Sequence, residues 1–254
     1  MTILDLFRLD GKVALVTGGG SGLGRGIAVA LAQAGADVAV AGRGTGLEET
    51  AQLVRETGRR ALVCKIDLSS TAQIPAMVET VTAELGGPEI LVNNAGTIRR
   101  AKALEMTEQD WDDVVNLNQR SLFFLSQAVA RGMAARGGGK IVNIASMMSF
   151  QGGLGVAAYA AAKHAVAGIT RAMAVELAPL GINVNAIAPG YMATDLTAAL
   201  QQNVERNRQI MERIPAGRWG SPADLAGAVV YLAAPASDYV QGHLLAVDGG
   251  WLSR

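Results

Sequence analysis

Short hydrophobic runs alternate along this chain with longer segments whose apolar residues recur every three or four positions. The runs are rich in β-branched residues and predict buried strands at residues 13–17, 37–41, 61–66, 89–93, 140–145, 183–188 and 244–247. The intervening segments predict helices at residues 23–34, 47–57, 71–85, 108–136, 157–180 and 222–233. This alternation is typical of an α/β fold: a doubly wound parallel sheet of about seven strands, with helices on both faces and a ligand crevice at the carboxyl ends of the strands.

The domain organisation follows from the chain length and from the continuity of this pattern. The chain has 254 residues, a size at which an α/β fold commonly forms one domain. No Pro/Ser-rich linker, charge block or repeat divides it, so we predict a single domain over residues 1–254. Residues 191–215 are polar and interrupt the alternation. They predict either a mobile substrate lid or a peripheral helix pair.

Composition and charge exclude several classes of function. Hydrophobic residues make up 50% of the chain and aromatic residues only 4%, so we expect an aliphatic core. Lys plus Arg and Asp plus Glu number 22 each, which gives no indication of a nucleic-acid or anionic-membrane partner. The single cysteine excludes an intrachain disulfide. With only two histidines besides, we expect no metal site.

The sequence also bears on location. Residues 1–10 mix apolar positions with Asp5, Arg8 and Asp10 and lack an unbroken signal-peptide core. The longest uncharged run, residues 141–162, contains Gln151 and a pair of glycines, which favours a strand, a loop and a helix start over a membrane span. We therefore expect a soluble, cytoplasmic protein.

A glycine-rich turn connects the first predicted strand to the first predicted helix. Its spacing is Gly-x3-Gly-x-Gly at Gly18, Gly22 and Gly24, with Ser21 directly before Gly22 and Leu23 directly after it. Glycine permits a tight turn and lets a pyrophosphate approach the free N–H groups at a helix N-terminus. The spacing differs from the G-x-G-x-x-G fingerprint, but its place in the alternating pattern predicts a Rossmann-type nucleotide-binding fold.

The ends of the third and fourth strands carry further candidate ligand contacts. Asp67-Leu68 follows the third strand, where the carboxylate is equally suited to bind adenine or to cap the next helix. The fourth strand ends in Asn93-Asn94-Ala95-Gly96. The paired amides can tie neighbouring strands together and line the ligand floor, and the small Ala and Gly leave room for a cofactor.

Four polar residues form the candidate catalytic set. Tyr159 and Lys163 are four residues apart in a helical pattern and share one face. Ser146 ends the fifth strand, and Asn118 lies in the long preceding helix. A free tyrosine has a pKa near 10, and lowering it by about 3 units requires roughly 4 kcal/mol. A nearby lysine ammonium and a positive nicotinamide ring could supply this in a partly dry pocket.

Together these motifs resemble the short-chain dehydrogenase/reductase family. The resemblance covers essentially the whole chain and rests, in the family's order, on Thr17, Gly18 to Gly24, Asn93 to Gly96, Asn118, Ser146, Tyr159, Lys163, Pro189 and Gly190. Within the family, the chain is most similar to sugar-acid dehydrogenases that act on gluconate and deoxygluconate. Segments that support this are residues 98–100, 111–113, 146–153, 185–194, 213–220 and 247–251.

The resemblance implies an NAD(P)-dependent oxidoreductase that transfers a hydride between nicotinamide and a secondary alcohol or ketone of a sugar acid. It implies that Tyr159 is the general acid/base and that Lys163 lowers the pKa of Tyr159 and holds the nicotinamide ribose. It assigns Ser146 to the carbonyl oxygen and Asn118 to a water relay. It places Pro189-Gly190 in the cofactor site and implies a homotetramer.

Substrate contacts are expected next to these motifs. Arg99 and Arg100 directly follow the turn after the fourth strand, and either guanidinium matches a substrate carboxylate, although both also suit a solvated loop. We also expect Met148, Gln151 and Tyr191 at the substrate, while core packing explains Met148 equally well.

The choice of nicotinamide depends on the end of the second strand. An NAD-preferring fold places an acidic residue there to bind the ribose 2′-hydroxyl. This chain instead has Gly42 and Arg43, with no carboxylate before Glu48. Arg43 can pair with a 2′-phosphate, which favours NADP, or stack on adenine and leave NAD acceptable.

Other functions remain open at this stage. One is a related reductase or dehydrogenase for polyol, steroid or 3-oxoacyl substrates. Another is a non-catalytic nucleotide-binding regulator. The presence of all four candidate catalytic residues argues against this function. A third is a sugar-nucleotide epimerase or dehydratase, which usually has a larger C-terminal substrate domain than this length allows.

Overall fold

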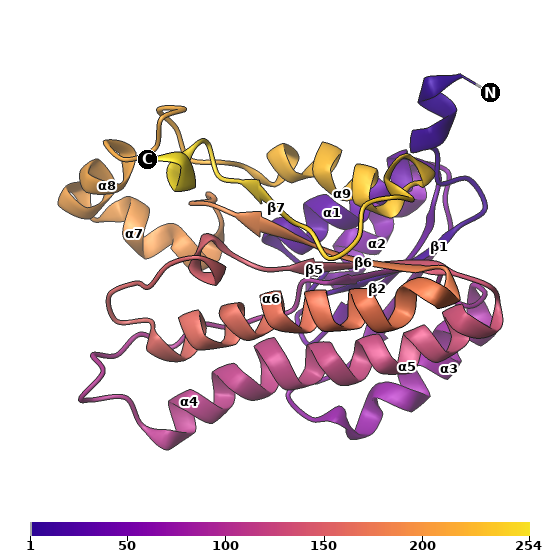
Figure 1. The fold of residues 1–254 in the computed structure, drawn as a ribbon, viewed down its shortest axis with the longest axis horizontal. Helices are drawn as coiled ribbons and strands as arrows, with labels where there is room; N and C mark the ends of the chain where they lie inside the picture. The colour runs from indigo at the N-terminus through magenta and orange to yellow at the C-terminus, as the bar shows by residue number, and fades with distance from the viewer. Residues whose placement is uncertain (1) are drawn as a thin grey trace.

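Seven parallel strands form one sheet in the order β3-β2-β1-β4-β5-β6-β7 (Figure 1). The structure is a computed structural model and describes residues 2–254. The strands are β1 (Val13–Thr17), β2 (Asp37–Gly42), β3 (Ala61–Lys65), β4 (Ile90–Asn93), β5 (Gly139–Ile144), β6 (Ile182–Pro189) and β7 (Leu244–Val247). All seven predicted strands are confirmed, and their ends differ from the predictions by at most one residue.

The helices also follow the predicted pattern. They are α1 (Gly22–Gln33), α2 (Leu47–Glu56), α3 (Ile74–Glu84), α4 (Glu108–Val115), α5 (Ser121–Ala135), α6 (Ala157–Leu177), α7 (Ala198–Gln202), α8 (Val204–Met211) and α9 (Ala226–Ala233). The predicted helix at 108–136 is two α-helices joined by a π-helical turn, Asn116–Arg120. Sequence periodicity does not resolve such a turn, because it shifts the hydrogen-bond register by only one residue.

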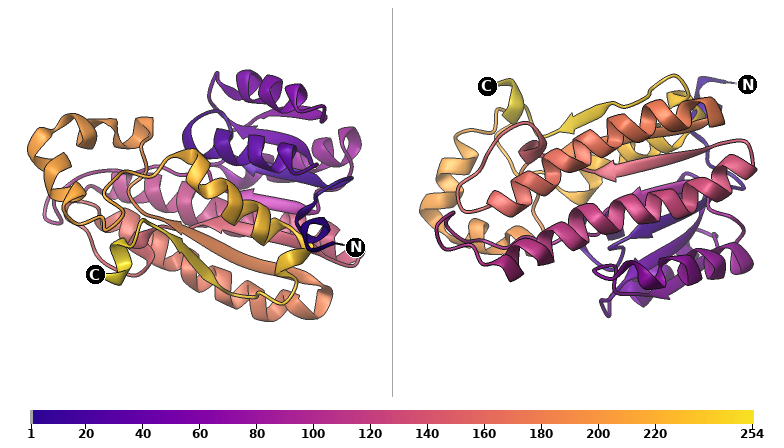
Figure 2. Two further views of the ribbon diagram at one scale, coloured as in Figure 1. Left: turned by 90° about the horizontal axis from the view of Figure 1, so that it is seen from above. Right: turned by 60° about the horizontal axis from the view of Figure 1, so that its bottom comes forward.

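Two helical layers cover the sheet (Figures 1 and 2). Apolar side chains of α1, α2 and α9 pack on one face, and those of α3, α5 and α6 pack on the other. The core is aliphatic, as expected, because small branched side chains fill the space between parallel strands and their crossover helices. The prediction of a single-domain, doubly wound α/β fold is confirmed.

The order of the strands fixes the position of a ligand crevice. From β1 the chain builds the sheet outward through β2 to β3, then returns to the other side of β1 with β4. The crossovers therefore diverge at β1 and β4, which leaves a crevice at their carboxyl ends.

Buried polar side chains hold the middle of the sheet to one helical layer. The Asn93 amide donates to Ser126 on α5 (2.8 Å) and to Asn143 on β5 (2.9 Å). Asn143 in turn donates to Thr170 on α6 at 2.9 Å. All four residues are buried. The predicted tie between neighbouring strands is thus confirmed for Asn93, and it fixes β5 against the helix that carries Tyr159 and Lys163.

Residues 191–215 form a short helical extension beyond the carboxyl end of the sheet. A 3-10 turn, Asp195–Thr197, leads into α7 and α8, which project from the body of the molecule (Figure 2). This arrangement agrees with the peripheral helix pair, one of the two alternatives predicted from the sequence. Across residues 2–254, no helix combines the length and apolar character needed to cross a membrane.

Candidate active site

A cleft of about 660 Å³ opens at the carboxyl ends of the central strands. It is lined by every residue predicted to bind the cofactor, namely Gly18, Ser21, Gly22, Leu23, Gly24, Arg43, Asp67, Leu68, Asn94, Ala95, Gly96, Tyr159, Lys163, Pro189 and Gly190. Ser146 lines it as well. The topology therefore brings together segments that are far apart in the sequence.

The glycine turn has no space for side chains at its central positions. Gly18 and Gly22 adopt positive φ angles of 63° and 51°, a region that favours glycine. A Cβ atom on Gly24 would overlap the carbonyl oxygen of Gly18, and one on Gly18 would lie 2.8 Å from the Asn94 amide nitrogen. Asn94 donates from that nitrogen to the carbonyl oxygens of Thr17 and Gly18. The turn is thus packed against the end of β4 and presents the start of α1 to the cleft, an arrangement suited to a pyrophosphate.

Tyr159 and Lys163 lie on one face of α6, directed at the end of β5. The Lys163 side-chain nitrogen is 5.6 Å from the centroid of the Tyr159 ring and donates to the carbonyl oxygen of Ile144 at 2.6 Å. Lys163 is buried, and this burial lowers its pKa to about 8. Burial raises the pKa of Tyr159, while the neighbouring Ser146 hydroxyl and the charge of Arg100 act to lower it.

Ser146 is oriented by the chain that follows it. Its hydroxyl oxygen accepts a hydrogen bond from the backbone N–H of Met148 at 3.1 Å, so that Ser146 caps a short 3-10 turn, Met147–Ser149. This contact uses a lone pair and leaves the hydroxyl proton available for donation. An oxygen atom bound between Ser146 and Tyr159 would therefore meet two O–H groups.

Asn118 is buried in the π-helical turn and does not line the cleft. Its side-chain oxygen accepts from the Thr97 N–H at 2.7 Å, and its side-chain nitrogen donates to the Thr97 carbonyl at 2.8 Å. The side chain therefore holds the segment after β4 in place. π turns occur frequently at functional sites, and this one contains Leu117, which does line the cleft.

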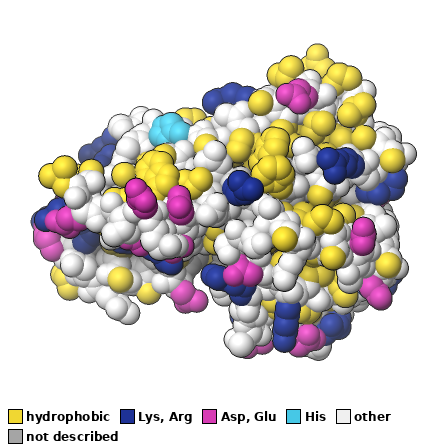
Figure 3. Space-filling view, turned by 90° about the horizontal axis from the view of Figure 1, so that it is seen from below, with side chains coloured by type: hydrophobic (Ala, Val, Ile, Leu, Met, Phe, Trp, Pro, Cys, Tyr) yellow, Lys and Arg dark blue, Asp and Glu magenta, His cyan; other side chains and the backbone are white. Residues whose placement is uncertain are grey.

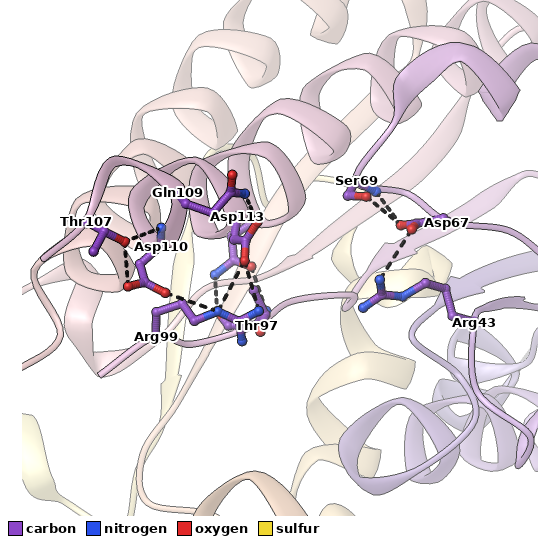
Figure 4. Close-up of polar contacts among 10 residues, drawn as sticks. Arg43, Asp67, Ser69, Thr97, Arg99, Thr107, Gln109, Asp110 and Asp113 are labelled. Atoms are coloured by element: carbon purple, nitrogen blue, oxygen red, sulfur yellow. Dashed lines mark hydrogen bonds and ion pairs between the residues drawn. The ribbon is translucent and has the colours of Figure 1, made fainter. Parts of the chain in front are cut away.

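Arg43 and Asp67 face one another across one end of the cleft (Figure 4). Their side chains form an ion pair at 3.3 Å and are 67% and 45% exposed. Asp67 also accepts from the backbone N–H and hydroxyl of Ser69, and these bonds are the main cause of its lowered pKa. Ser70 occupies the N-cap position of the following 3-10 helix, without a capping hydrogen bond from its side chain, so the alternative that Asp67 is the N-cap is wrong. Asp67 instead shapes the turn and keeps one oxygen toward the cleft.

The two adjacent arginines have different surroundings. Arg99 binds Asp113 at 2.9 Å and lies 3.6 Å from Asp110, both on α4 (Figure 4). Its guanidinium is therefore occupied by protein carboxylates, which argues against its predicted contact with substrate. Among residues 2–254 no carboxylate pairs with Arg100, and its charge acts on Tyr159. Neither arginine lines the cleft itself.

The other predicted substrate residues lie around an apolar cluster beside Tyr159. Met148 is buried in this cluster and Tyr191 is half-buried in it, with its ring 5.3 Å from that of Trp219 and 4.8 Å from that of Trp251. Gln151 is half-buried in the loop after Met148. Met148, Gln151 and Tyr191 do not line the main cleft, so core packing accounts for Met148 at least as well as substrate contact.

The sequence analysis missed several residues that line the cleft. They are Gly42, Gly44, Ile66, Leu117, Ile144, Ala145, Met192 and the run Thr194 to Thr197. The last run belongs to the extension at 191–215 and approaches the glycine turn, since a Cβ on Gly22 would lie 3.5 Å from Thr194. Two sequence signals pointed to this run: its place just after Pro189-Gly190, and the lid predicted as one alternative for residues 191–215.

Comparison with known proteins agrees with this geometry. Residues 18–252 match the model of a family described as enoyl-(acyl carrier protein) reductase. The chain is 56% identical to 2-dehydro-3-deoxy-D-gluconate 5-dehydrogenase of Escherichia coli K12, covering 99% of this chain and 100% of that protein. It is 53% identical to the enzyme of the same name from Bacillus subtilis 168, covering 98% of each chain.

A solved structure shares both the fold and the sequence pattern. The gluconate 5-dehydrogenase of Burkholderia cenocepacia J2315, in complex with NADP and tartrate, superposes with a TM-score of 0.95. It is 42% identical, and the alignment covers 100% of both chains. The chain thus belongs to the short-chain dehydrogenase/reductase family, a class of NAD(P)-dependent oxidoreductases.

Proposed function

We propose that the protein interconverts a hydroxyl and a ketone at carbon 5 of a six-carbon sugar acid, and that 2-dehydro-3-deoxygluconate is the hydroxyl form that is oxidised. The observation that carries this proposal is the identity of 56% and 53%, over nearly the full length of both partners, to two enzymes of that name. Conversion of gluconate is the second candidate, supported by the structural similarity to gluconate 5-dehydrogenase.

Proton transfer and its support are assigned to separate side chains of this protein. Tyr159 takes the hydroxyl proton in oxidation and returns it in reduction, and Ser146 donates a hydrogen bond to the same oxygen. The Lys163 ammonium stabilises the tyrosinate and holds the nicotinamide ribose. The nicotinamide, when bound, accepts or supplies the hydride. Because Thr97 engages the Asn118 side chain at one oxygen and one amide hydrogen, the second amide hydrogen of Asn118 is the side-chain group left to order a water relay.

The cleft fits a dinucleotide, with NADP preferred. The packed glycine turn at the start of α1 supports a pyrophosphate site, and Ala95-Gly96 and Pro189-Gly190 line the path toward Tyr159. Arg43, at the end of β2, has an exposed guanidinium suited to a ribose 2′-phosphate. Asp67 lies across from it, suited to the adenine amino group. NADP in the Burkholderia enzyme supports the same preference.

Arg100 is the proposed partner of the substrate carboxylate. Its charge acts on Tyr159, no carboxylate among residues 2–254 pairs with it, and Arg99 is already paired. Arg100→Met should raise KM for the sugar acid by about tenfold or more and leave an uncharged polyol analogue nearly unaffected. Met148, Gln151 and Tyr191 remain proposed neighbours of the carbon chain.

Residues 191–215 are proposed to act as a lid over the cleft. Their run Thr194 to Thr197 lines the cleft, while Ile210 and Ile214 in and after α8 pack into the apolar cluster beside Tyr159. Such a segment can exclude water once substrate is bound. The test is a fluorescence titration of Trp219, which bonds Asn207 on α8.

A homotetramer in the cytoplasm is also proposed. Trp111, Phe123, Phe124 and Val175 are exposed apolar side chains on α4, α5 and α6, and hydrophobic groups gather in patches on the side of these helices (Figure 3). Exposed apolar patches frequently mark protein interfaces. The buried, free Cys64 fits a reducing compartment. Analytical ultracentrifugation tests the tetramer, and cell fractionation tests the cytoplasmic location.

The substrate proposal is tested by initial rates with both cofactors. The panel comprises 2-dehydro-3-deoxygluconate, 5-ketogluconate, a neutral ketose, a steroid ketone and a 3-oxoacyl thioester. We expect kcat/KM for oxidation of 2-dehydro-3-deoxygluconate, or for reduction of its 5-ketone, to exceed the others by at least about tenfold, equivalent to about 1.4 kcal/mol. A higher value for the acyl thioester or the steroid would overturn the proposal.

A further inference from the structure

The segment after β4 is attached to its surroundings at three alternate residues. The Thr97 backbone is held by the Asn118 side chain, and the Arg99 side chain is held by Asp113. The Ala101 N–H donates to the carbonyl oxygen of Gly155, just before α6, at 3.1 Å. The two residues between these points are Ile98 and Arg100.

The two carboxylates that bind Arg99 are themselves held in place by hydrogen bonds from residues at the start of α4. Gln109 donates to Asp113 at 2.7 Å, one helical turn away on α4. Thr107, the N-cap of α4, donates to Asp110 at 2.7 Å (Figure 4). The two carboxylates therefore present fixed oxygens to one guanidinium, which contacts Asp113 through both Nε and Nη2. A network of this kind holds a position better than an isolated exposed pair, which contributes little.

The residues between the attachment points face the catalytic side. Ile98 packs into the apolar cluster that includes Tyr159 and Met148. The Arg100 charge acts on Tyr159, whereas Arg99 is turned toward α4. Neighbouring residues thus have opposite partners, as in an extended chain whose side chains alternate. Fixing Arg99 on α4 consequently fixes the side to which Arg100 points.

We propose that Arg99 is a positioning residue, whose ion pairs with Asp113 and Asp110 hold Arg100 in place to bind the substrate carboxylate. The inference rests on the proposed role of Arg100 at the substrate. Arg99 itself does not touch the reacting atoms. Removal of the Arg99 side chain releases the segment between Thr97 and Ala101. Substrate binding must then also order Arg100, and the entropy lost in doing so weakens the binding.

The first test is a double-mutant cycle on the sugar-acid reaction. Arg99→Met and Asp113→Asn should each raise KM for the sugar acid by about three- to tenfold, with kcat within about twofold, because uniform binding is lost. In an Arg100→Met background, Arg99→Met should have no further effect, since the residue it positions is gone. Arg99→Lys, which retains the charge, should recover part of the loss.

A matched control separates positioning from a general surface effect. Arg55 forms a similar exposed pair with Glu48 at 2.7 Å on α2, and its side chain is 42% exposed compared with 45% for Arg99. Arg55→Met should leave KM unchanged. Additive effects of Arg99→Met and Arg100→Met would overturn the proposal, and so would equal losses by Arg99→Met for the sugar acid and for a neutral polyol.

A second readout does not depend on the sugar acid. The Lys163 side-chain nitrogen lies 5.6 Å from the centroid of the Tyr159 ring, and the charge of Arg100 acts to lower the pKa of Tyr159. With a neutral secondary alcohol as substrate, the pH midpoint of oxidation should therefore move upward in Arg100→Met, and in the same direction in Arg99→Met. If the native enzyme rejects sugar acids but these midpoints still move together, the proposed substrate fails and the positioning role stands. The positioning role would be overturned if the pH midpoint moved in Arg100→Met but stayed unchanged in Arg99→Met.

Discussion

The Lys163 ammonium lies 2.6 Å from the carbonyl oxygen of Ile144, so a charged group joins the middle of α6 to the last residue of β5. Only 5% of Lys163 is exposed. Burial disfavours the charged form and lowers the pKa of Lys163 from 10.5 to about 8. The enzyme thus keeps a cation beside Tyr159 at a cost to the stability of the fold.

Replacing Lys163 with Met should stabilise the protein at pH 7 while abolishing turnover. Because the pKa of Lys163 is lower in the folded state, the unfolded chain binds more protons between pH 8 and 10.5, and stability rises across that range. The loss of folding stability from burying the charged lysine is fully present below about pH 8. It corresponds to about 3 kcal/mol, and the hydrogen bond to Ile144 offsets part of it. We expect the Tm of the variant to be a few degrees higher at pH 7.

The same variant at high pH provides the check. The gain in Tm should shrink toward zero as the pH approaches 10, where the native lysine is neutral in the folded state. Lys65→Met, at an exposed position on β3, should show no such trend. A Lys163→Met protein that is less stable than the native one at every pH would contradict the expectation.

Tyr159→Phe should remove turnover by a factor of at least about a thousand and leave cofactor affinity nearly unchanged. The phenol is the proposed proton donor and acceptor at the reacting oxygen, whereas the cofactor is held by the glycine turn and Lys163. Steady-state rates and a nucleotide titration measure the two properties separately. Turnover close to that of the native enzyme would refute the assignment.

Arg43→Ala should abolish the preference for NADP. The guanidinium at the end of β2 is the cation proposed for the 2′-phosphate, and its loss removes a charge-assisted contact of about 1.5–3 kcal/mol. The ratio of kcat/KM with NADP to that with NAD should fall by about tenfold or more. A native preference for NAD that the substitution does not alter would show that Arg43 has another role.

Gly24→Ala should impair cofactor binding more than it impairs folding. The added methyl group would overlap the Gly18 carbonyl oxygen and crowd the Asn94 amide, so the turn must open where the pyrophosphate is expected. Cofactor affinity should fall by at least about tenfold. Gly168→Ala on α6, where a Cβ meets nothing within 4 Å, is the matched control, and unchanged affinity in Gly24→Ala would argue against the pyrophosphate site.

The sequence by itself determined the strands, the layered fold and the candidate cofactor residues, all of which line the cleft. Buried parallel strands and amphipathic helices have local periodicities, so each element could be predicted from its own residues. The glycine turn, Ser146, Tyr159 and Lys163 follow from the same logic, because the carboxyl ends of parallel strands meet at one edge of the sheet.

Only the tertiary structure distinguished Arg99 from Arg100, showed that Ser70 rather than Asp67 occupies the N-cap position of the 3-10 helix, and turned the Asn118 side chain toward Thr97. It also brought Thr194 to Thr197 to the cleft. Three of these outcomes depend on a partner from a segment distant in sequence: Asp113 for Arg99, Thr97 for Asn118 and Gly22 for Thr194. Local patterns carry no information about such partners, because side-chain contacts of this kind form only when the folded backbone brings the two segments within hydrogen-bonding or van der Waals distance.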